Sequence, residues 1–259
     1  VRRVAQILNN LSGGKLSKNE TILRIYHKWM AGKRSFGEFD MYIPATRIGI
    51  ENDETKEFIS NRSKGNIFWD VGSNIGYFPL YVSKSANYVR AFEPEPTNYD
   101  ILEKNLQMND FSNIKSHQIA ISTEAGEAEL FRSGSEGSGI HSLANDERLS
   151  EDTQTVSTQT IDNLVNRFEV PDFIKVDVEG AEMKVLEGAE NSLEYYNIEW
   201  FIEVHSPRTG KRIDRIGQHN GDIESMYSKL KQKGYNIYGY QKGDLVDFHI
   251  SDDTVPLHW

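Results

Sequence analysis

The stretch Ile67-Phe-Trp-Asp-Val-Gly-Ser-Asn-Ile-Gly76 decides the fold. Its first five residues form a short apolar run that is typical of a buried strand. Gly72 and Gly76 then allow a tight strand-to-helix turn and a close backbone approach by a ligand. A second apolar run, 88–92, ends in Glu93, about twenty residues after the glycine turn. This order predicts the nucleoside-binding half of a Rossmann-like fold, with Glu93 placed for two ribose hydroxyls.

The glycine turn favours a cofactor without phosphate. Dinucleotide-binding turns usually follow G-x-G-x-x-G and set a pyrophosphate against a helix N-terminus, whereas this turn is G-x-x-x-G. Asp70 is predicted to face the same crevice, where a carboxylate would repel phosphate but attract a cation. S-adenosylmethionine has no phosphate and carries an ammonium and a sulfonium. The alternatives are NAD and an ordinary strand-loop-helix with incidental glycines.

Four segments share a pattern with one known family. They are DVGSNIG (70–76), AFEPEP (91–96), KVDVEGAE (175–182) and EVH (203–205). In this order they resemble the successive signatures of FkbM-type methyltransferases, over about the middle half of the chain. The resemblance implies an α/β, Rossmann-like class I methyltransferase fold, with a mostly parallel seven-stranded sheet and helices on both faces. It also implies O-methylation of hydroxyls on natural products or sugars.

Composition narrows the class of protein. The 259 residues are 37% hydrophobic and 26% charged, which is compatible with a soluble globular protein. The net charge of −10 argues against a nucleic-acid partner, and the lack of cysteine removes disulfides, thiolate zinc sites and cysteine nucleophiles. No apolar run approaches the roughly 18 residues of a membrane span, and no signal-peptide pattern is present. We therefore predict a cytoplasmic protein. The sequence starts at Val1 rather than methionine, so residues can be missing upstream.

Two amphipathic segments precede the cofactor-binding pattern. Apolar residues recur at helical spacing over 4–11 and 22–29, so we expect an N-terminal helical cap, with an oligomer interface as the alternative. A predicted hairpin and a third helix follow. We place a domain boundary near Ser63, between an N-terminal extension (1–62) and the S-adenosylmethionine-binding domain (63–259). The sequence leaves the oligomeric state open.

The remaining core strands follow Glu93. They are predicted over 114–120, 173–178 and 200–205, with a closing hairpin over 235–240 and 245–250. Two further strands are expected over 127–131 and 153–160. The polar, glycine- and serine-rich segment 133–152 between them is predicted to be a loop that closes over the acceptor. A surface insertion is the alternative.

Acidic residues gather at the ends of two predicted core strands. Asp177 and Glu179 follow the fourth strand, and Glu203 and His205 follow the fifth. Alternation puts the members of each pair on one side, and the carboxyl ends of neighbouring parallel strands share one crevice. Methyl transfer to an alcohol needs a base or a metal ion that removes the proton. We therefore predict that these four residues form the acceptor side, with His205 as the natural base.

A divalent cation is a further hypothesis for this cluster. Carboxylates with one imidazole suit magnesium, manganese or calcium, and Asp177 and Glu203 are the tentative ligands. The alternative is that these carboxylates pair with Lys175, Arg208 or backbone amides and only close the strand ends. The predicted cofactor-binding residues are Asp70, Gly72, Ser73, Asn74, Gly76, Glu93, Pro94 and Ala120. Among them, Asp70 is expected to accept the ammonium of S-adenosylmethionine. Ala120 is included only by analogy with methyltransferases of this class.

Together these patterns predict an S-adenosylmethionine-dependent methyltransferase that methylates a hydroxyl on a sugar or natural product. Its partner would be a small-molecule or glycan acceptor. One alternative is methyl-ester formation on a sugar acid, which needs no base because the carboxylate is already nucleophilic. The others are an NAD-dependent oxidoreductase on the same fold and a nucleoside-binding module without activity.

Overall fold

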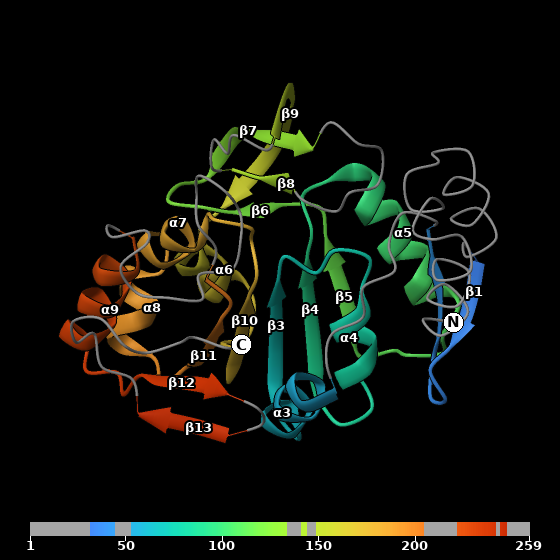
Figure 1. The fold of residues 1–259 in the computed structure, drawn as a ribbon, viewed down its shortest axis with the longest axis horizontal. Coiled ribbons are helices and arrows are strands. Elements are labelled where there is room, and N and C mark those ends of the chain that lie inside the picture. Colours follow the sequence, from blue (N-terminus) through green and yellow to red (C-terminus); the bar gives the residue numbers. More distant parts are fainter. Residues whose placement is uncertain are drawn as a thin grey trace, which may run out of the picture.

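A computed structural model describes residues 32–44, 53–133, 141–143, 149–204, 222–241 and 244–247. Within them, five parallel strands form the central sheet in the order β11-β10-β3-β4-β5 (Figure 1). Their bounds are β3 Ile67–Val71, β4 Tyr88–Phe92, β5 Ile114–His117, β10 Phe173–Val176 and β11 Glu199–Ile202. The order reverses at β3, which pairs with β4 on one side and β10 on the other. A crevice is therefore expected at the carboxyl ends of β3 and β10.

Helices cover both faces of this sheet (Figure 1). One face packs against α6 (Ile161–Arg167), α7 (Glu182–Glu187), α8 (Glu190–Tyr195) and α9 (Asp222–Gln232). The other packs against α3 (Asp53–Ser63), α4 (Tyr77–Val82) and α5 (Pro96–Gln107). Alternation along β3 sends Trp69 and Val71 to the first core and Phe68 to the second. The predicted Rossmann-like α/β fold is confirmed.

The described sheet has five strands, whereas the sequence predicts seven. The predicted closing hairpin forms as β12 (Tyr238–Gln241) and β13 (Asp244–Asp247), which pair with each other. Among the described residues, neither strand is hydrogen-bonded to the central sheet. Instead, the Tyr240 ring lies 4.8 Å from the Phe58 ring and 5.9 Å from the Phe201 ring, between centroids. Aromatic packing, rather than strand pairing, attaches this hairpin to the fold.

A second sheet follows β5. It contains β6 (Ala120–Ile121), β7 (Gly126–Ser133), β8 (His141–Ser142) and β9 (Leu149–Gln159) in the order β6-β9-β7-β8. The predicted third core strand over 114–120 is thus divided between two sheets, and β7 and β9 form a long antiparallel ribbon. Parts of the predicted loop 133–152 are strands of this sheet, while 134–140 and 144–148 lie outside the described residues.

The hairpin before α3 is tied to α5. It consists of β1 (Gly32–Ser35) and β2 (Asp40–Ile43). The backbone N–H of Tyr42 donates to Asn105 Oδ1 at 2.6 Å, and that of Asp40 donates to Asn109 Oδ1 at 2.9 Å. Met41 and Ile43 point to the second core. Backbone and side-chain contacts therefore fix the hairpin against the fold.

The predicted N-terminal helices over 4–11 and 22–29 lie outside the described residues, as does the cap they would form. The domain boundary near Ser63 stays a prediction. In the part of the chain that the structure describes, no helix combines the length and apolar character needed to cross a membrane.

Candidate functional site

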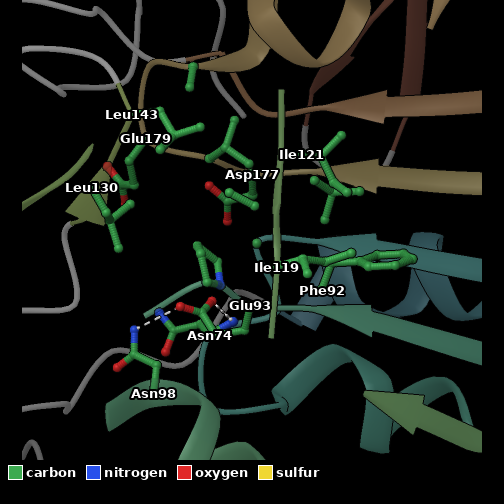
Figure 2. A pocket seen from close by; sticks show the side chains of 16 residues that line it. Asn74, Phe92, Glu93, Asn98, Ile119, Ile121, Leu130, Leu143, Asp177 and Glu179 are labelled. Atoms are coloured by element: carbon green, nitrogen blue, oxygen red, sulfur yellow. Dashed lines mark hydrogen bonds between the residues drawn. The ribbon is translucent and has the colours of Figure 1, made fainter. Parts of the chain in front are cut away.

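A pocket lies at the carboxyl ends of β3, β4 and β10. Its charged lining residues are Glu93, Asp177 and Glu179, and none of the described lining residues is Lys, Arg or His. Figure 2 shows Asp177 and Glu179 across the pocket from Glu93. The apolar lining residues include Phe92, Ile119 and Ile121 on one flank and Leu130 and Leu143 on the other (Figure 2). The pocket therefore combines negative charge with two apolar walls.

Gly72 brings the ends of β3 and β10 together. Its φ is 86°, in the left-handed region that favours glycine, and a Cβ there would lie 1.9 Å from the backbone oxygen of Asp177. The backbone N–H groups of Gly72 and Ser73 both donate to the Phe92 carbonyl at 3.0 Å. The glycine turn predicted from the sequence is thus fixed to the ends of two neighbouring strands.

Glu93 holds the next part of this turn. Asn74 has a φ of 54°, which residues other than glycine rarely adopt. Its backbone N–H donates to Glu93 Oε2 at 2.7 Å. Glu93 Oε1 accepts from the Glu95 backbone N–H at 3.1 Å and from Asn98 Nδ2 at 3.3 Å (Figure 2). Glu93 therefore presents a carboxylate of fixed orientation to the pocket.

Asp70 is not part of the pocket lining. It is 1% exposed, and its partner on β10 is Lys175, which is 2% exposed. Lys175 Nζ lies 3.5 Å from Asp70 Oδ1 and 3.2 Å from Asp177 Oδ2. Burial raises the pKa of the Asp70 carboxyl, and the positive charge of Lys175 opposes this rise. One buried ammonium thus joins two carboxylates, and we call this group the Asp70–Lys175–Asp177 triad.

Glu179 also occupies a strained turn. Its φ is 54°, and Gly180 follows with a φ of 104°. The Gly180 backbone N–H donates to Glu182 Oε1 at 3.0 Å, which ties the turn to the start of α7. Two of the pocket-lining residues, Asn74 and Glu179, therefore have left-handed backbones that are costly outside glycine. Such strain gathers at functional sites more often than elsewhere.

The structure brings most of the predicted site residues together. Those that line the pocket are Gly72, Asn74, Glu93, Pro94, Ala120, Asp177 and Glu179. Those that do not are Asp70, Ser73, Gly76 and Glu203. Ser73 supports the turn from behind, because its Oγ donates to the Asp70 carbonyl at 2.7 Å and accepts from the Phe92 N–H at 3.1 Å. His205 lies outside the described residues.

The described residues do not fit the predicted divalent cation site. They contain no group of three or more His, Cys, Asp or Glu side chains that could hold a metal ion. Asp177 contacts the Lys175 ammonium, and Glu203 is buried at the end of β11, outside the pocket lining.

Sequence reasoning missed several residues of this site. Lys175 was considered only as a partner that closes a strand end, although a lysine within a buried apolar strand is itself unusual. Asn98 belongs to the first turn of α5, and no pattern marks it. Leu130 and Leu143 reach the pocket from the second sheet, so only its three-dimensional arrangement reveals them.

Known proteins resemble this chain along most of its length. Hexuronic acid methyltransferase AglP of Haloferax volcanii is 32% identical over 196 residues, which cover 75% of this chain and 78% of that protein. Methyltransferase sdnD of Sordaria araneosa is 28% identical over 213 residues, covering 69% and 77% respectively. The crystal structure of an FkbM methyltransferase from Methylobacillus flagellatus matches 65% of this chain and 37% of that chain, with a TM-score of 0.43 and 16% identity. The family model of the methyltransferase FkbM domain matches residues 70–237, and the chain belongs to this family of S-adenosylmethionine-dependent methyltransferases.

Proposed function

We propose that this protein transfers a methyl group from S-adenosylmethionine to an oxygen atom of a sugar or natural product. The observation that carries this proposal is the charge of the pocket, whose described lining holds Glu93, Asp177 and Glu179 and no basic side chain. These carboxylates attract the ammonium and the sulfonium of S-adenosylmethionine. They would repel the pyrophosphate of NAD, so the charge favours the methyl donor over the oxidoreductase alternative.

The pocket residues suit the separate parts of this cofactor. Glu93 offers a fixed carboxylate to the ribose hydroxyls. Phe92, Ile119 and Ile121 offer an apolar wall to the adenine ring. Asp177 stands on the opposite side from Glu93 and offers a carboxylate to the ammonium (Figure 2). S-adenosylmethionine supplies an electrophilic methyl carbon when it is bound.

A hydroxyl acceptor has to lose its proton near the transition state. Asp177 contacts the Lys175 ammonium. We therefore assign the removal of the hydroxyl proton to the carboxylate of Glu179, which is half-buried. His205, predicted from the sequence as a base, remains a second candidate. The net charge of −10 supports a small-molecule or glycan acceptor over a nucleic acid.

A sugar acid is a second candidate acceptor, with a methyl ester as the product. The observation in its favour is the 32% identity to a hexuronic acid methyltransferase. A carboxylate is already ionised near neutral pH and needs no base before it attacks a methyl group. The two candidates therefore differ in whether Glu179 is needed for the chemistry.

A labelling experiment separates these two candidates. The protein is incubated with methyl-labelled S-adenosylmethionine and either methyl glucoside or glucuronic acid, and the sugar product is then treated with alkali. An ether keeps its label, whereas an ester releases labelled methanol. Glu179→Gln should slow ether formation by about a hundredfold, the size of a lost general base, and leave ester formation within about threefold of wild type.

Glu127→Gln is the matched control, because Glu127 is an exposed residue of β7 that does not line the pocket. It should leave both reactions unchanged. Label in neither sugar, from protein that binds S-adenosylhomocysteine, would contradict a sugar acceptor and leave natural-product hydroxyls as the class to test.

A further inference from the structure

We propose that Lys175 is a positioning residue, which holds the Asp177 carboxylate toward the ammonium of the methyl donor while Asp70 balances the Lys175 charge from behind. The inference rests on the proposed function, because it takes S-adenosylmethionine as the ligand. It gives a role to the buried Lys175 ammonium, which does not take part in the methyl-transfer chemistry.

The two strands place the Asp70–Lys175–Asp177 triad on one side of the sheet. Lys175 and Asp70 are direct neighbours across the parallel pair β10–β3. Asp177 follows Lys175 by two residues, so both side chains point to the same face. The Lys175 ammonium also lies 4.8 Å from the centroid of the Phe78 ring of α4, which encloses it from above this face. The register brings Lys175 and Asp70 together, and Asp177 joins them from the position directly after the end of β10.

Packing alone does not account for Lys175. The other residues of β10 are Phe173, Ile174 and Val176, and all are buried. An apolar side chain at position 175 would continue this pattern, and replacing a whole buried ion pair, here Lys175 together with Asp70, by apolar residues of similar volume is often neutral or stabilising. Charged groups that remain in such a place are candidates for a functional role.

The charges of the triad leave a negative charge directed at the pocket. One ammonium and two carboxylates sum to a net charge of about −1 when all three are ionised. Neither Asp70 oxygen accepts a hydrogen bond from the described residues, so its compensation comes from Lys175 at 3.5 Å. Asp70 thus neutralises the ammonium on the side away from the pocket. Asp177 keeps its attraction for a cation while Lys175 limits its orientations.

The exposed fractions of the Asp70 and Asp177 side chains indicate which carboxylate contacts the ligand. The Asp177 side chain is 22% exposed and lines the pocket, whereas the Asp70 side chain is 1% exposed and does not. The inference therefore moves the contact with the ammonium from Asp70, where the sequence predicts it, to Asp177. Asp70 becomes the residue that keeps Lys175 in place.

Two ligands test this assignment without the acceptor. S-adenosylhomocysteine carries the ammonium, while methylthioadenosine has the same adenosine and sulfur but lacks the amino-acid part. Calorimetry measures the affinity of each ligand for the wild-type protein, for Lys175→Met, for Asp177→Asn and for the double variant. Lys175→Met should weaken the binding of S-adenosylhomocysteine by about tenfold, which corresponds to the loss of one charge-assisted hydrogen bond. It should leave methylthioadenosine within about twofold of wild type.

The double variant tests whether Lys175 acts through Asp177. Residues that act as a unit give non-additive effects. Lys175→Met combined with Asp177→Asn should therefore bind S-adenosylhomocysteine no more weakly than Asp177→Asn alone. The matched control is Lys115→Met, the same substitution at an exposed position of β5, which should bind both ligands as wild type does.

Three outcomes would overturn the assignment. Unchanged or tighter binding of S-adenosylhomocysteine by Lys175→Met would mean that Asp177 does not need Lys175 to bind the ammonium. An equal loss for both ligands would mean general damage to the pocket. Additive losses in the double variant would mean that Lys175 does not act through Asp177.

Folding and the proposed function are checked separately. If Lys175→Met does not fold, Lys175→Met with Asp70→Asn removes both buried charges together and should show the same selective loss. Wild-type protein that binds neither ligand would overturn the proposed function and the assignment with it. Wild-type protein that binds both, with a Lys175 variant that loses neither, would overturn only the assignment.

Discussion

Asp70 and Glu93 are equally buried but differ in what surrounds them. They are 1% and 5% exposed; Asp70 lies near the end of β3, and Glu93 directly follows the adjacent strand β4. Glu93 accepts hydrogen bonds from the N–H groups of Asn74, Glu95 and Asn98. Asp70 instead faces the Lys175 ammonium, and no described residue donates a hydrogen bond to its carboxylate.

The difference explains why only one of the two carboxylates lines the pocket. The donors to Glu93 come from the turn after β3 and the start of α5, so they hold it at the mouth of the crevice. The partner of Asp70 is a side chain of the buried strand β10, so it holds Asp70 inside the sheet. Burial alone therefore does not identify a binding carboxylate. The position of its partners does.

The largest expected effect is at Gly72, which directly follows β3, the strand of Asp70, and donates its N–H to the carbonyl of Phe92, the residue before Glu93. Gly72→Ala should lower the free energy of unfolding by about 3 kcal/mol or more and abolish S-adenosylhomocysteine binding, because the new Cβ would collide with the Asp177 backbone. Urea denaturation and calorimetry measure the two effects. Gly65→Ala is the control, since Gly65 also has a positive φ, 73°, but no atom lies within 4 Å of its Cβ position. Similar losses in both variants would show that backbone strain, and not the collision, is responsible.

Glu93→Ala should have the next largest effect. The substitution removes the carboxylate that would accept from the ribose hydroxyls, and it leaves the N–H groups of Asn74, Glu95 and Asn98 without this acceptor. Binding should therefore weaken by about a hundredfold. Because methylthioadenosine has the same ribose, calorimetry should show this loss for both ligands, in contrast to Lys175→Met. Glu127→Ala on β7 is the control and should bind both normally. A loss restricted to S-adenosylhomocysteine would place Glu93 near the amino-acid part instead.

Stability should show the dependence of Asp70 on Lys175. Lys175→Met alone leaves Asp70 buried without its counter-charge and should cost about 3 kcal/mol of unfolding free energy. The double variant with Asp70→Asn removes both charges and should lie within about 1 kcal/mol of wild type. Urea denaturation measures both. A double variant that is less stable than the single one would argue against the ion pair between these residues.

The smallest effect concerns His117, which supports the Glu93 region from behind. Its ring stacks on Phe92 with 5.2 Å between centroids, and its carbonyl accepts from the Glu93 N–H at 3.1 Å. Burial, reinforced by the positive charge of Arg90, lowers the pKa of His117 from 6.5 to about 4. The unfolded chain then binds more protons than the folded one between these two values, so stability should fall as the pH drops through this window.

His117→Gln should reduce this pH dependence. Urea denaturation of wild type and variant across the window from 6.5 to about 4 provides the measurement. Parallel curves for the two proteins would show that His117 does not carry the effect.

The sequence predicted the parts of this site that depend on local patterns. The strand before Gly72, the glycine turn and the acid after the second strand are contiguous signals, and the structure contains each of them. The pairing of Lys175 with Asp70 depends on which strands are neighbours and in what register, and one sequence does not contain that information. The walls formed by Leu130 and Leu143 depend on how a second sheet packs on the first.

The strand count differs for a similar reason. Alternation identifies the hairpin of β12 and β13, yet it does not say which edge the hairpin joins. Among the described residues, the ring of Tyr240 packs beside Phe58 and Phe201, and the hairpin strands pair only with each other. Long-range packing, which the local pattern does not contain, therefore determines where the hairpin attaches to the fold.

The central claim is that the pocket at the ends of β3, β4 and β10 binds the methyl donor. Calorimetric titration of the wild-type protein with S-adenosylhomocysteine, in parallel with NAD, tests it most directly. We predict micromolar binding of S-adenosylhomocysteine and no detectable binding of NAD, because the described pocket lining carries three carboxylates and no basic side chain. Folded protein that binds NAD, or that fails to bind S-adenosylhomocysteine, would contradict the account.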